Sequence, residues 1–343
     1  PCAPEADRNP LMKPNKILGE REIIEIIQNH LTHMPKMPIP FGDDVSAYDL
    51  GNHKLAVLKT DMLVARTDVP KTMSLWQAAR KAVIMNISDF AAKGVKPLAL
   101  MVSLGLPRGL SEEDIQEIAE GLDAGAREYD AYILGGDTAE ASDVIINVSV
   151  FGIAKKADVI LRSGAEPGDI VAVTGPFGKT AAGLKILSEN LKASRNIRQL
   201  LIQSVLMPHA RLREGLALNK TKAVTAAIDS SDGLAWSLHE IAKASNTGFL
   251  INKLPTARET QTFAKLNKLD PVELTLYGGE EYELVLAMKP MLWSKAREAT
   301  AKIGATLLPI GKVTAEKHAL LRVGGKTCAI EPRGYEHFKP DTI

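Results

Sequence analysis

Five loops of this chain place acidic residues beside glycine or hydroxyl residues, and most of them border an apolar run that is typical of a strand. Glycine lets the backbone come close to a ligand, and carboxylates at strand ends offer oxygen atoms to a hard cation such as Mg²⁺. In proteins Mg²⁺ usually also bridges to substrate phosphates. The pattern therefore predicts an ATP-using enzyme whose metal cluster is assembled from distant parts of the chain. The loops are Gly42-Asp43-Asp44, Thr60-Asp61, Gly135-Gly136-Asp137-Thr138, Asp229-Ser230-Ser231-Asp232-Gly233 and Gly278-Gly279-Glu280-Glu281.

Composition excludes several other classes of protein. The net charge of the 343 residues is +1, so no basic field recruits nucleic acid. No apolar run approaches about 20 residues, and we expect no membrane span. The only cysteines are Cys2 and Cys328, which makes a disulfide framework or a zinc site improbable and indicates a reducing, cytoplasmic setting.

The order of the expected elements indicates two α+β domains, because strands and helices mix without a strict βαβ alternation. Turn residues interrupt the pattern over 162–169, and we place the domain boundary there. This gives a flexible arm at 1–18, an N-terminal domain at 19–160 and a C-terminal domain at 161–343.

Hydrophobic periodicity and turn residues predict the main strands and helices. We expect a helix after Gly19. The other helices with expected bounds are 74–92 and one from Ser111 to about Tyr129. Within the strand expected at 98–106, alternate apolar residues should lie on one side, and the strand at 131–134 should end at Gly135. The expected strands are 54–64, 98–106, 131–134, 144–153, 170–174 and 282–288.

Asp89 is the acidic residue with the best positional argument. It lies on the helical stripe that Leu75, Ala79 and Ala82 otherwise fill. A buried carboxylate is costly unless it is paired or bound to a metal. We therefore favour a metal-related role for Asp89, and the alternatives are a cap at the end of the helix or an ion pair with a lysine.

Single loops are less specific than their combination. Gly42-Asp43-Asp44 alone is compatible with a plain turn, and 229–233 with a helix N-cap, although a helix N-terminus also binds phosphate. Adjacent acids on a strand point apart, so at most one of Glu280 and Glu281 is expected to face a site. Arg162 is suited to phosphate by its fork of donors, but a surface arginine fits the sequence equally well.

The segment from Gly175 to Thr180 imitates a P-loop, since it follows a strand and opens a helix. The pattern requires a glycine where Val173 stands, and Pro176 removes a backbone donor. We therefore interpret this segment as the start of a helix.

Eight segments in order, from Gly42 to Phe338, resemble the thiamine-monophosphate kinase family. Together they are highly specific, although each alone is not. They are the five loops above together with Asn86-Ile87-Ser88-Asp89, Arg162-Ser163-Gly164-Ala165 and Gly334-Tyr335-Glu336-His337-Phe338.

The resemblance implies transfer of the γ-phosphoryl group of ATP to thiamine monophosphate, which yields thiamine diphosphate, with several Mg²⁺ ions. It also implies an N-terminal mixed sheet with helices that dimerises through its sheet, a C-terminal α/β sandwich, and a site in the cleft between the domains. No histidine or cysteine lies within the five acidic loops or within 86–89, so we expect direct in-line transfer without a phosphoenzyme.

Individual roles follow from the resemblance, position by position. The metal ligands would be Asp44, Thr60, Asp61, Asp89, Asp137, Asp229 and Asp232. The ATP contacts would be Gly136, Asp137, Arg162 and Ser231, and the catalytic set Asp89, Asp137, Asp229 and Arg162. The thiamine phosphate contacts would be Asp68, Glu280, Pro332 and Tyr335.

Two departures from the family pattern concern the expected thiazole and pyrimidine pocket: Asp68 stands where members often carry a histidine, and Pro332-Arg333 where some carry a tryptophan. Lys59 is a further departure, since it stands where a small hydroxyl residue is common before Thr-Asp. The phosphate machinery is thus better supported than the vitamin pocket. Two alternatives stay open: an ATP-dependent synthetase resembling aminoimidazole ribonucleotide synthetase, and a non-catalytic protein that binds divalent cations.

Overall fold

The computed structural model describes residues 18–338 in two units, which we treat separately. Residues 1–17 of the predicted arm lie outside the described part. One unit contains helix α1 (Glu20–His30), which begins after Gly19 as predicted, and the segment 336–338, whose His337 N–H donates to Glu20 at 3.1 Å. The other unit spans 36–335 and contains both sheets. None of the described helices is long and apolar enough to cross a membrane.

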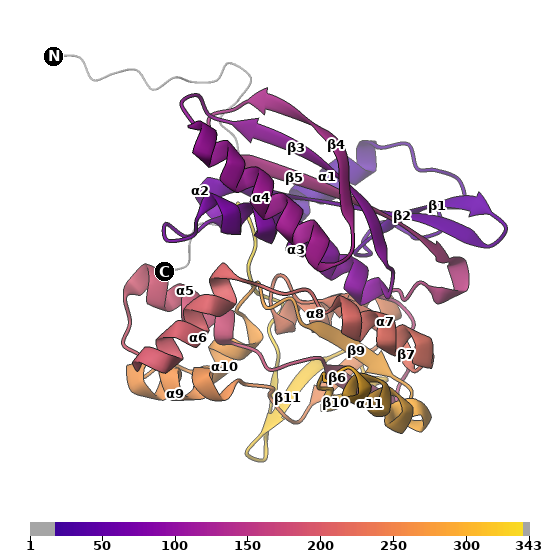
Figure 1. Cartoon of the computed structure of the whole chain (residues 1–343). Helices are drawn as coiled ribbons and strands as arrows, with labels where there is room; N and C mark the ends of the chain where they lie inside the picture. Colours follow the sequence, from indigo (N-terminus) through magenta and orange to yellow (C-terminus); the bar gives the residue numbers. More distant parts are fainter. Residues whose placement is uncertain (1–17, 339–343) are drawn as a thin grey trace. The chain divides into compact units, whose positions relative to one another are not determined.

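The first sheet of the large unit has five strands in the order β1-β2-β5-β3-β4 (Figure 1). Strands β3 and β4 run parallel and the other pairs antiparallel, so the sheet is mixed as expected. The strand predicted at 54–64 has the predicted bounds. The strands are β1 (Ser46–Gly51), β2 (Lys54–Val64), β3 (Pro97–Leu106), β4 (Tyr132–Glu140) and β5 (Ile145–Lys155).

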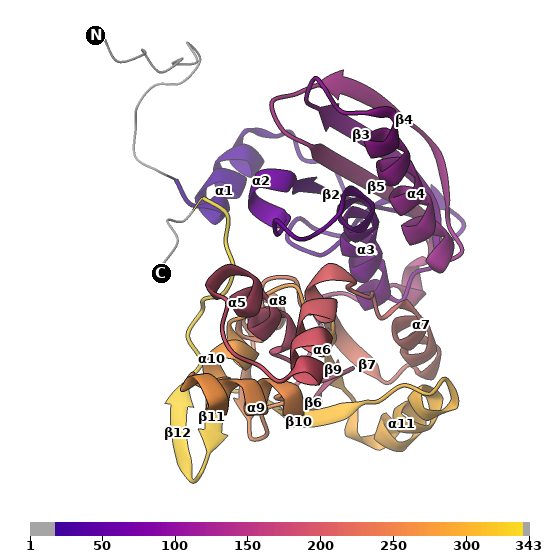
Figure 2. The same ribbon diagram turned by 60° about the vertical axis from the view of Figure 1, so that its left-hand side comes forward.

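Helix α3 (Leu75–Lys93) packs against both sheets of the large unit, since it contacts β2 and β5 and also two strands of the second sheet, β7 and β9 (Figure 2). Fifteen of its nineteen residues are buried, so every polar side chain among them needs a partner. Ser74 begins the helix with a capping box, and Gly94 ends it in the left-handed conformation, at φ 63°. Helix α4 (Glu112–Glu128) starts at the predicted N-cap Ser111 and packs on α3; the short α2 (Ala65–Asp68) follows β2.

The second sheet has seven strands in the order β12-β11-β8-β10-β6-β9-β7. Its strands are β6 (Ile170–Val173), β7 (Val224–Asp229), β8 (Gly248–Ile251), β9 (Leu284–Met288), β10 (Leu308–Thr314), β11 (Ala319–Val323) and β12 (Lys326–Ala329). The helices of this part are α5 (Lys179–Glu189), α6 (Arg195–Leu206), α7 (Leu212–Thr221), α8 (Leu234–Ser245), α9 (Arg258–Asn267), α10 (Pro271–Leu276) and α11 (Trp293–Lys302), with short 3₁₀ turns at Lys156–Asp158 and Pro290–Leu292.

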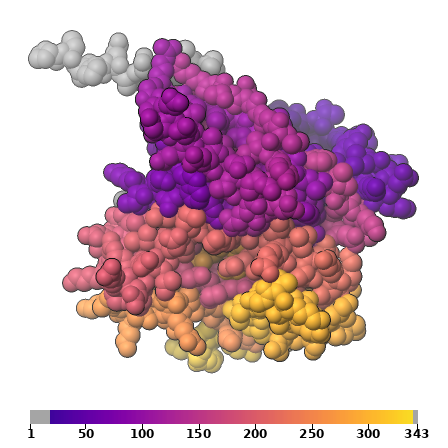
Figure 3. Space-filling model, viewed as in Figure 1, coloured from indigo at the N-terminus to yellow at the C-terminus, as the bar shows by residue number. Residues whose placement is uncertain are grey.

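One hydrophobic core joins the two sheets through α3. It contains Ile87 and Phe90 of α3, Val148 of β5 and Leu286 of β9. A second core lies in the C-terminal part, where strands of the second sheet pack with α8 and with residues of neighbouring loops. The two sheet-based parts predicted from the sequence are therefore present, and Figure 3 shows the magenta and orange segments in direct contact.

Three expectations about strands are corrected. Strand β4 does not stop before Gly135 but continues to Glu140 beside β3, because a side chain at Gly136 would lie 1.8 Å from the Val102 carbonyl oxygen and glycine allows this approach. Leu98 is 41% exposed, since the pairing register shifts between Pro97 and Ala99 and breaks the predicted alternation. The strand expected at 282–288 begins only at Leu284, after a loop with positive φ at Glu280 and Tyr282.

Candidate active site

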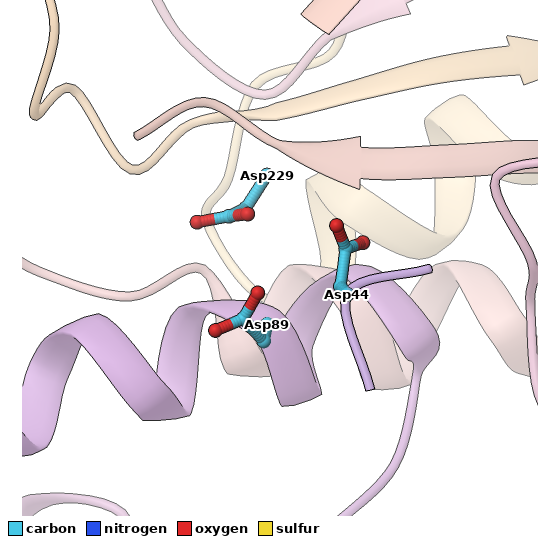
Figure 4. Close-up of side chains that lie close together, drawn as sticks. All are labelled: Asp44, Asp89 and Asp229. Atoms are coloured by element: carbon cyan, nitrogen blue, oxygen red, sulfur yellow. The ribbon is translucent and has the colours of Figure 1, made fainter. Parts of the chain in front are cut away.

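Three aspartates from distant parts of the chain converge in the large unit. Asp44, Asp89 and Asp229 each offer a carboxylate oxygen within 4.8 Å of the other two, and all three are buried (Figure 4). Asp89 comes from the last turns of α3, Asp229 from the end of β7, and Asp44 from the loop before β1. Their convergence from three elements is the arrangement that the acidic loops predict.

Local structure explains each position. Gly42 has a φ of 92°, which glycine adopts without strain, and it turns the loop that delivers Asp44. Asp89 follows Ser88 on the buried surface of α3, and the Ser88 hydroxyl donates to Asp229 Oδ2 at 2.6 Å. This hydrogen bond joins α3 to β7 beside the carboxylates of Asp89 and Asp229.

Three basic side chains neutralise part of this charge. Lys93 lies 2.7 Å from both Asp43 and Asp44 and donates to the Ala227 carbonyl at 2.9 Å. The Arg162 Nε donates to Asp44 Oδ1 at 2.6 Å, and its Nη1 to the Gly42 carbonyl at 2.9 Å. Arg162 is thus an internal partner of the cluster rather than a free surface arginine.

Lys59 is the third base. Its Nζ lies 3.0 Å from Asp61 Oδ1 and 3.1 Å from Asp89 Oδ2. The lysine partner that we considered for Asp89 is therefore present, and it comes from the neighbouring strand β2. Asp61 joins the cluster through the same ammonium group.

Burial and the neighbouring charges shift the pKa values of the three aspartates in different directions. Burial raises the pKa of Asp89 well above its usual range, and Asp229, Asp61 and Asp44 add to the effect although Lys59 opposes it. Burial and the charge of Asp44 raise the pKa of Asp229 to about 7. Burial also disfavours ionisation of Asp44, but Lys93 and Arg162 more than offset it and its pKa is lowered.

This donor set fits a hard divalent cation. All three converging ligands are carboxylates, which Mg²⁺ and Ca²⁺ prefer, and no histidine or cysteine of the described residues joins them. The buried Ser230 hydroxyl next to Asp229 also has no hydrogen-bond partner among the described residues. A divalent ion at the three aspartates would keep them ionised despite their burial.

Thr60 and Asp137 lie on the other face of the first sheet. Adjacent residues of a strand point to opposite faces, so Thr60 points away when Asp61 points to the cluster. The Thr60 hydroxyl donates to Asn147 at 2.8 Å, and Asp137 pairs with Ser103, whose neighbour on β5 is again Asn147. Three strand spacings of about 4.8 Å separate β2 from β4, roughly 14 Å. Within one chain, the structure does not bring these two side chains to the aspartate cluster, and Gly136 has a packing role against Val102.

Three loops of the C-terminal part are bonded to one another. The Tyr282 N–H donates to the Ser230 carbonyl at 2.9 Å, and the Tyr335 N–H donates to the Asp232 carbonyl at 3.1 Å. The Ser231 hydroxyl donates to Asp232 at 3.3 Å. The loops that carry the predicted ATP and acceptor contacts of this half are therefore neighbours. Asp232 is not among the three converging carboxylates. Pro332 is exposed beside it.

Asp68 and Glu280 meet at a buried lysine. Lys81 of α3 is fully buried, donates to the Asp68 carbonyl at 2.9 Å and forms an ion pair with Glu280. The Asp68 side chain accepts from the Val64 N–H at 2.7 Å. The two residues expected at the acceptor end thus come together across the two halves of the large unit.

Glu281 points away from Glu280, as expected for one of two adjacent acids. Its carboxylate accepts from the backbone N–H groups of Gly178 and Thr180 at 2.6 and 3.0 Å, at the N-terminus of α5. The prediction of a helix start rather than a P-loop is confirmed, because α5 begins at Lys179. An internal carboxylate occupies the donors that a P-loop would offer to phosphate.

No role was predicted for Ser88, Lys81 or Lys93, and Lys59 was noted only as a departure from the family pattern. The sequence does contain a usable signal for two of them: Lys81 and Lys93 lie on a mostly apolar helix, where a charged residue needs a buried partner.

Comparison with known domains places the chain in a superfamily. Residues 42–154 match the AIR synthase related protein N-terminal domain, and residues 166–324 match the C-terminal domain of the same proteins. The chain thus has the two domains of an AIR synthase related protein.

Full-length relatives narrow the class. The chain is 37% identical to the thiamine-monophosphate kinase of Nitrosopumilus maritimus, over 94% of this chain and 99% of that relative. It is 31% identical to that of Bacillus subtilis, over 94% and 100%. The structure of AaThiL complexed with AMPPCP and TMP superposes with a TM-score of 0.82 at 27% identity, over 95% of this chain and 99% of the other. The chain belongs to the thiamine-monophosphate kinase family.

Proposed function

We propose that this protein transfers the γ-phosphoryl group of ATP to thiamine monophosphate, giving thiamine diphosphate, in a reaction that depends on Mg²⁺. Relatives named for this activity cover nearly the whole chain, and a related structure holds AMPPCP and TMP. The observation that carries the proposal is the convergence of Asp44, Asp89 and Asp229 within 4.8 Å.

In this proposal the two halves of the large unit divide the work. Residues 19–160 supply Asp44, Asp61 and Asp89 for the metal ions, and residues 161–343 supply the acceptor surface. Asp229 contributes to the ions from the C-terminal half, with Asp232 as a further candidate. Bound Mg²⁺ would supply the positive charge that lets two anionic substrates approach and that stabilises the transferring phosphoryl group.

The chain itself orients the phosphates. Arg162 has donors in a planar fork, and its position beside Asp44 puts that fork next to the metal cluster. Ser231 and Gly136 are the further ATP contacts that we propose. No general base is needed, because the acceptor phosphate has a second pKa of about 6 and is ionised near neutral pH. Direct in-line transfer follows, without a covalent phosphoenzyme.

The acceptor end is proposed at Asp68, Glu280, Pro332 and Tyr335. Thiamine carries a positively charged thiazolium ring, and the Glu280 carboxylate at the edge of the cluster is complementary to that charge. Lys81 holds the Glu280 carboxylate by an ion pair, and the hydrogen bond from Lys81 to the Asp68 carbonyl holds Lys81 itself in place. Arg333 stacks 3.4 Å from the Tyr277 ring centroid and bonds Glu273, which holds the segment that contains Pro332.

We also propose that two copies pair through the outer face of the first sheet. Leu58, Met62, Met101 and Ile153 lie there and are 45% to 52% exposed. Such an apolar sheet face is typical of an interaction surface. Because Asp137 and Thr60 lie on this same face, pairing would bury them and bring them to a second chain.

A panel of phosphorylated acceptors tests the function. Each acceptor is incubated with ATP and Mg²⁺, and the products are identified by phosphorus NMR. We expect thiamine monophosphate to be converted fastest, to a diphosphate ester. A cyclised nucleotide product would instead indicate an activity like that of aminoimidazole ribonucleotide synthetase. Failure of ATP to bind with Mg²⁺ in calorimetry would indicate a non-catalytic cation-binding protein.

A covalent intermediate has its own test. Enzyme, Mg²⁺ and ATP are incubated with labelled ADP and without acceptor. Direct transfer predicts no exchange of label into ATP. Exchange at a rate comparable with turnover would reject the in-line scheme.

A further inference from the structure

Lys59 occupies a position among the carboxylates that a cation would favour. Lys59 and Asp61 are two residues apart on β2, so both side chains point to the same face, toward α3. The Lys59 Nζ lies 3.0 Å from Asp61 and 3.1 Å from Asp89, and both of these partners are carboxylates. Its side chain is 19% exposed, against 34% for Asp61 and 7% for Asp89, so the ammonium group lies between the buried cluster and the solvent.

The other two bases differ from Lys59 in their partners. Lys93 is fully buried and also bonds the Ala227 carbonyl, and Arg162 also bonds the Gly42 carbonyl. Both therefore fix the backbone of the cluster. The ion pairs of Lys59 instead join two acidic side chains, which it bridges as a metal ion would.

The charges define how much positive charge the cluster can still accept. Six carboxylates face the three bases: those of Asp43, Asp44, Asp61, Asp89 and Asp229, and that of Glu240, which lies 3.6 Å from Arg162. This leaves three negative charges in excess when all groups are ionised. One divalent ion would leave a single negative charge unbalanced. With an uncharged residue in place of Lys59, the excess would be four charges, which two divalent ions would balance.

We propose that the ammonium group of Lys59 takes the place of one divalent ion in the active site, between Asp61 and Asp89. The inference rests on the proposed function, since it presumes that the neighbouring carboxylates hold Mg²⁺ for phosphoryl transfer. A lysine ammonium is a compact point charge, so it can bridge two carboxylates as an ion does, but it cannot be lost or exchanged. The protein consequently needs one divalent ion fewer than the same site with a neutral side chain at this position.

The test counts bound ions. Mn²⁺ replaces Mg²⁺, AMPPCP is present, and free Mn²⁺ is measured by electron paramagnetic resonance over a titration of the full chain. We expect Lys59→Met to bind one Mn²⁺ more per chain than the wild type. Lys59→Arg, which keeps the charge, and Lys54→Met, an exposed lysine of the same strand, should bind the wild-type number.

Equal numbers of ions in Lys59→Met and the wild type would overturn the inference. If the wild type binds no Mn²⁺ beyond that held by free AMPPCP, the proposed metal-dependent function itself is rejected, so the two failures are distinguishable.

A second measurement does not depend on the folding of a variant. Wild-type crystals are grown with Mn²⁺ and AMPPCP, and anomalous scattering locates the ions. We expect Mn²⁺ at Asp44 and Asp229 and the Lys59 Nζ still between Asp61 and Asp89. An Mn²⁺ peak that bridges Asp61 and Asp89, with Lys59 displaced, contradicts the proposal.

Discussion

Replacing Asp89 by asparagine should separate stability from activity. Its carboxylate has two negative neighbours, Asp44 and Asp229, within 4.8 Å, and one positive neighbour, Lys59, at 3.1 Å. At an effective dielectric constant of about 20, each repulsion is about 3.5 kcal/mol and the attraction about 5 kcal/mol. The two repulsions exceed the attraction by about 2 kcal/mol. Without divalent ions, Asp89→Asn should therefore be up to about 2 kcal/mol more stable than the wild type. Partial protonation of Asp89 in the wild type would reduce this difference in stability toward zero.

With Mg²⁺ and AMPPCP the order should reverse, since the wild type binds the ions more tightly and binding stabilises the folded state. Turnover of Asp89→Asn should fall about 100-fold or more, the usual cost of removing one electrostatic group from a transition state. Chemical unfolding at pH 8 with and without Mg²⁺ and AMPPCP, together with the phosphorus NMR assay, measures both effects. The control is Asp123→Asn, an exposed aspartate on α4. Near-normal turnover at saturating Mg²⁺, or a loss of several kcal/mol in the absence of ions, would refute the reasoning.

Three further predictions concern other parts of the molecule. Burial raises the pKa of Glu281 to about 7, so the folded state favours the neutral acid. The contribution of Glu281 to the free energy of unfolding therefore falls as the pH rises from about 4.5 to about 7. Glu281→Gln should lack that fall and be up to about 3 kcal/mol more stable than the wild type at pH 8, but not at pH 4.5; identical pH profiles in urea unfolding would contradict this. Lys93→Met removes a positive partner of Asp43 and Asp44 and should lower the free energy of unfolding by about 3–5 kcal/mol. A loss of less than about 1 kcal/mol in urea unfolding would contradict this role of Lys93. Met62→Glu on the outer sheet face should convert a dimer to monomers in sedimentation velocity, and an unchanged sedimentation coefficient would count against pairing through this face.

Local signals predicted several elements, mainly of the N-terminal half, because they act over a few residues. Ser111 is the N-cap of a helix as expected, the helix expected at 74–92 begins after Ser74, and β2 has its predicted bounds. The errors arise where tertiary packing overrides propensity. Strand β4 runs through two glycines because its neighbour β3 approaches closely, and the bulge in β3 exposes Leu98. Neither effect can be predicted from the residues of a single strand, because each depends on the neighbouring strand.

The sequence by itself singled out acidic residues at strand ends and on a buried helical stripe, among them Asp44, Asp89 and Asp229. It did not distinguish these three from Asp137 and Asp232. It could not assign faces, because alternation along a strand fixes relative but not absolute orientation, and only pairing across the sheet puts Thr60 and Asp137 opposite Asp61. Nor could it pair Lys59 with Asp89, since their separation in sequence says nothing about the distance between their charges. The balance of charge among these side chains was decided by the tertiary structure alone.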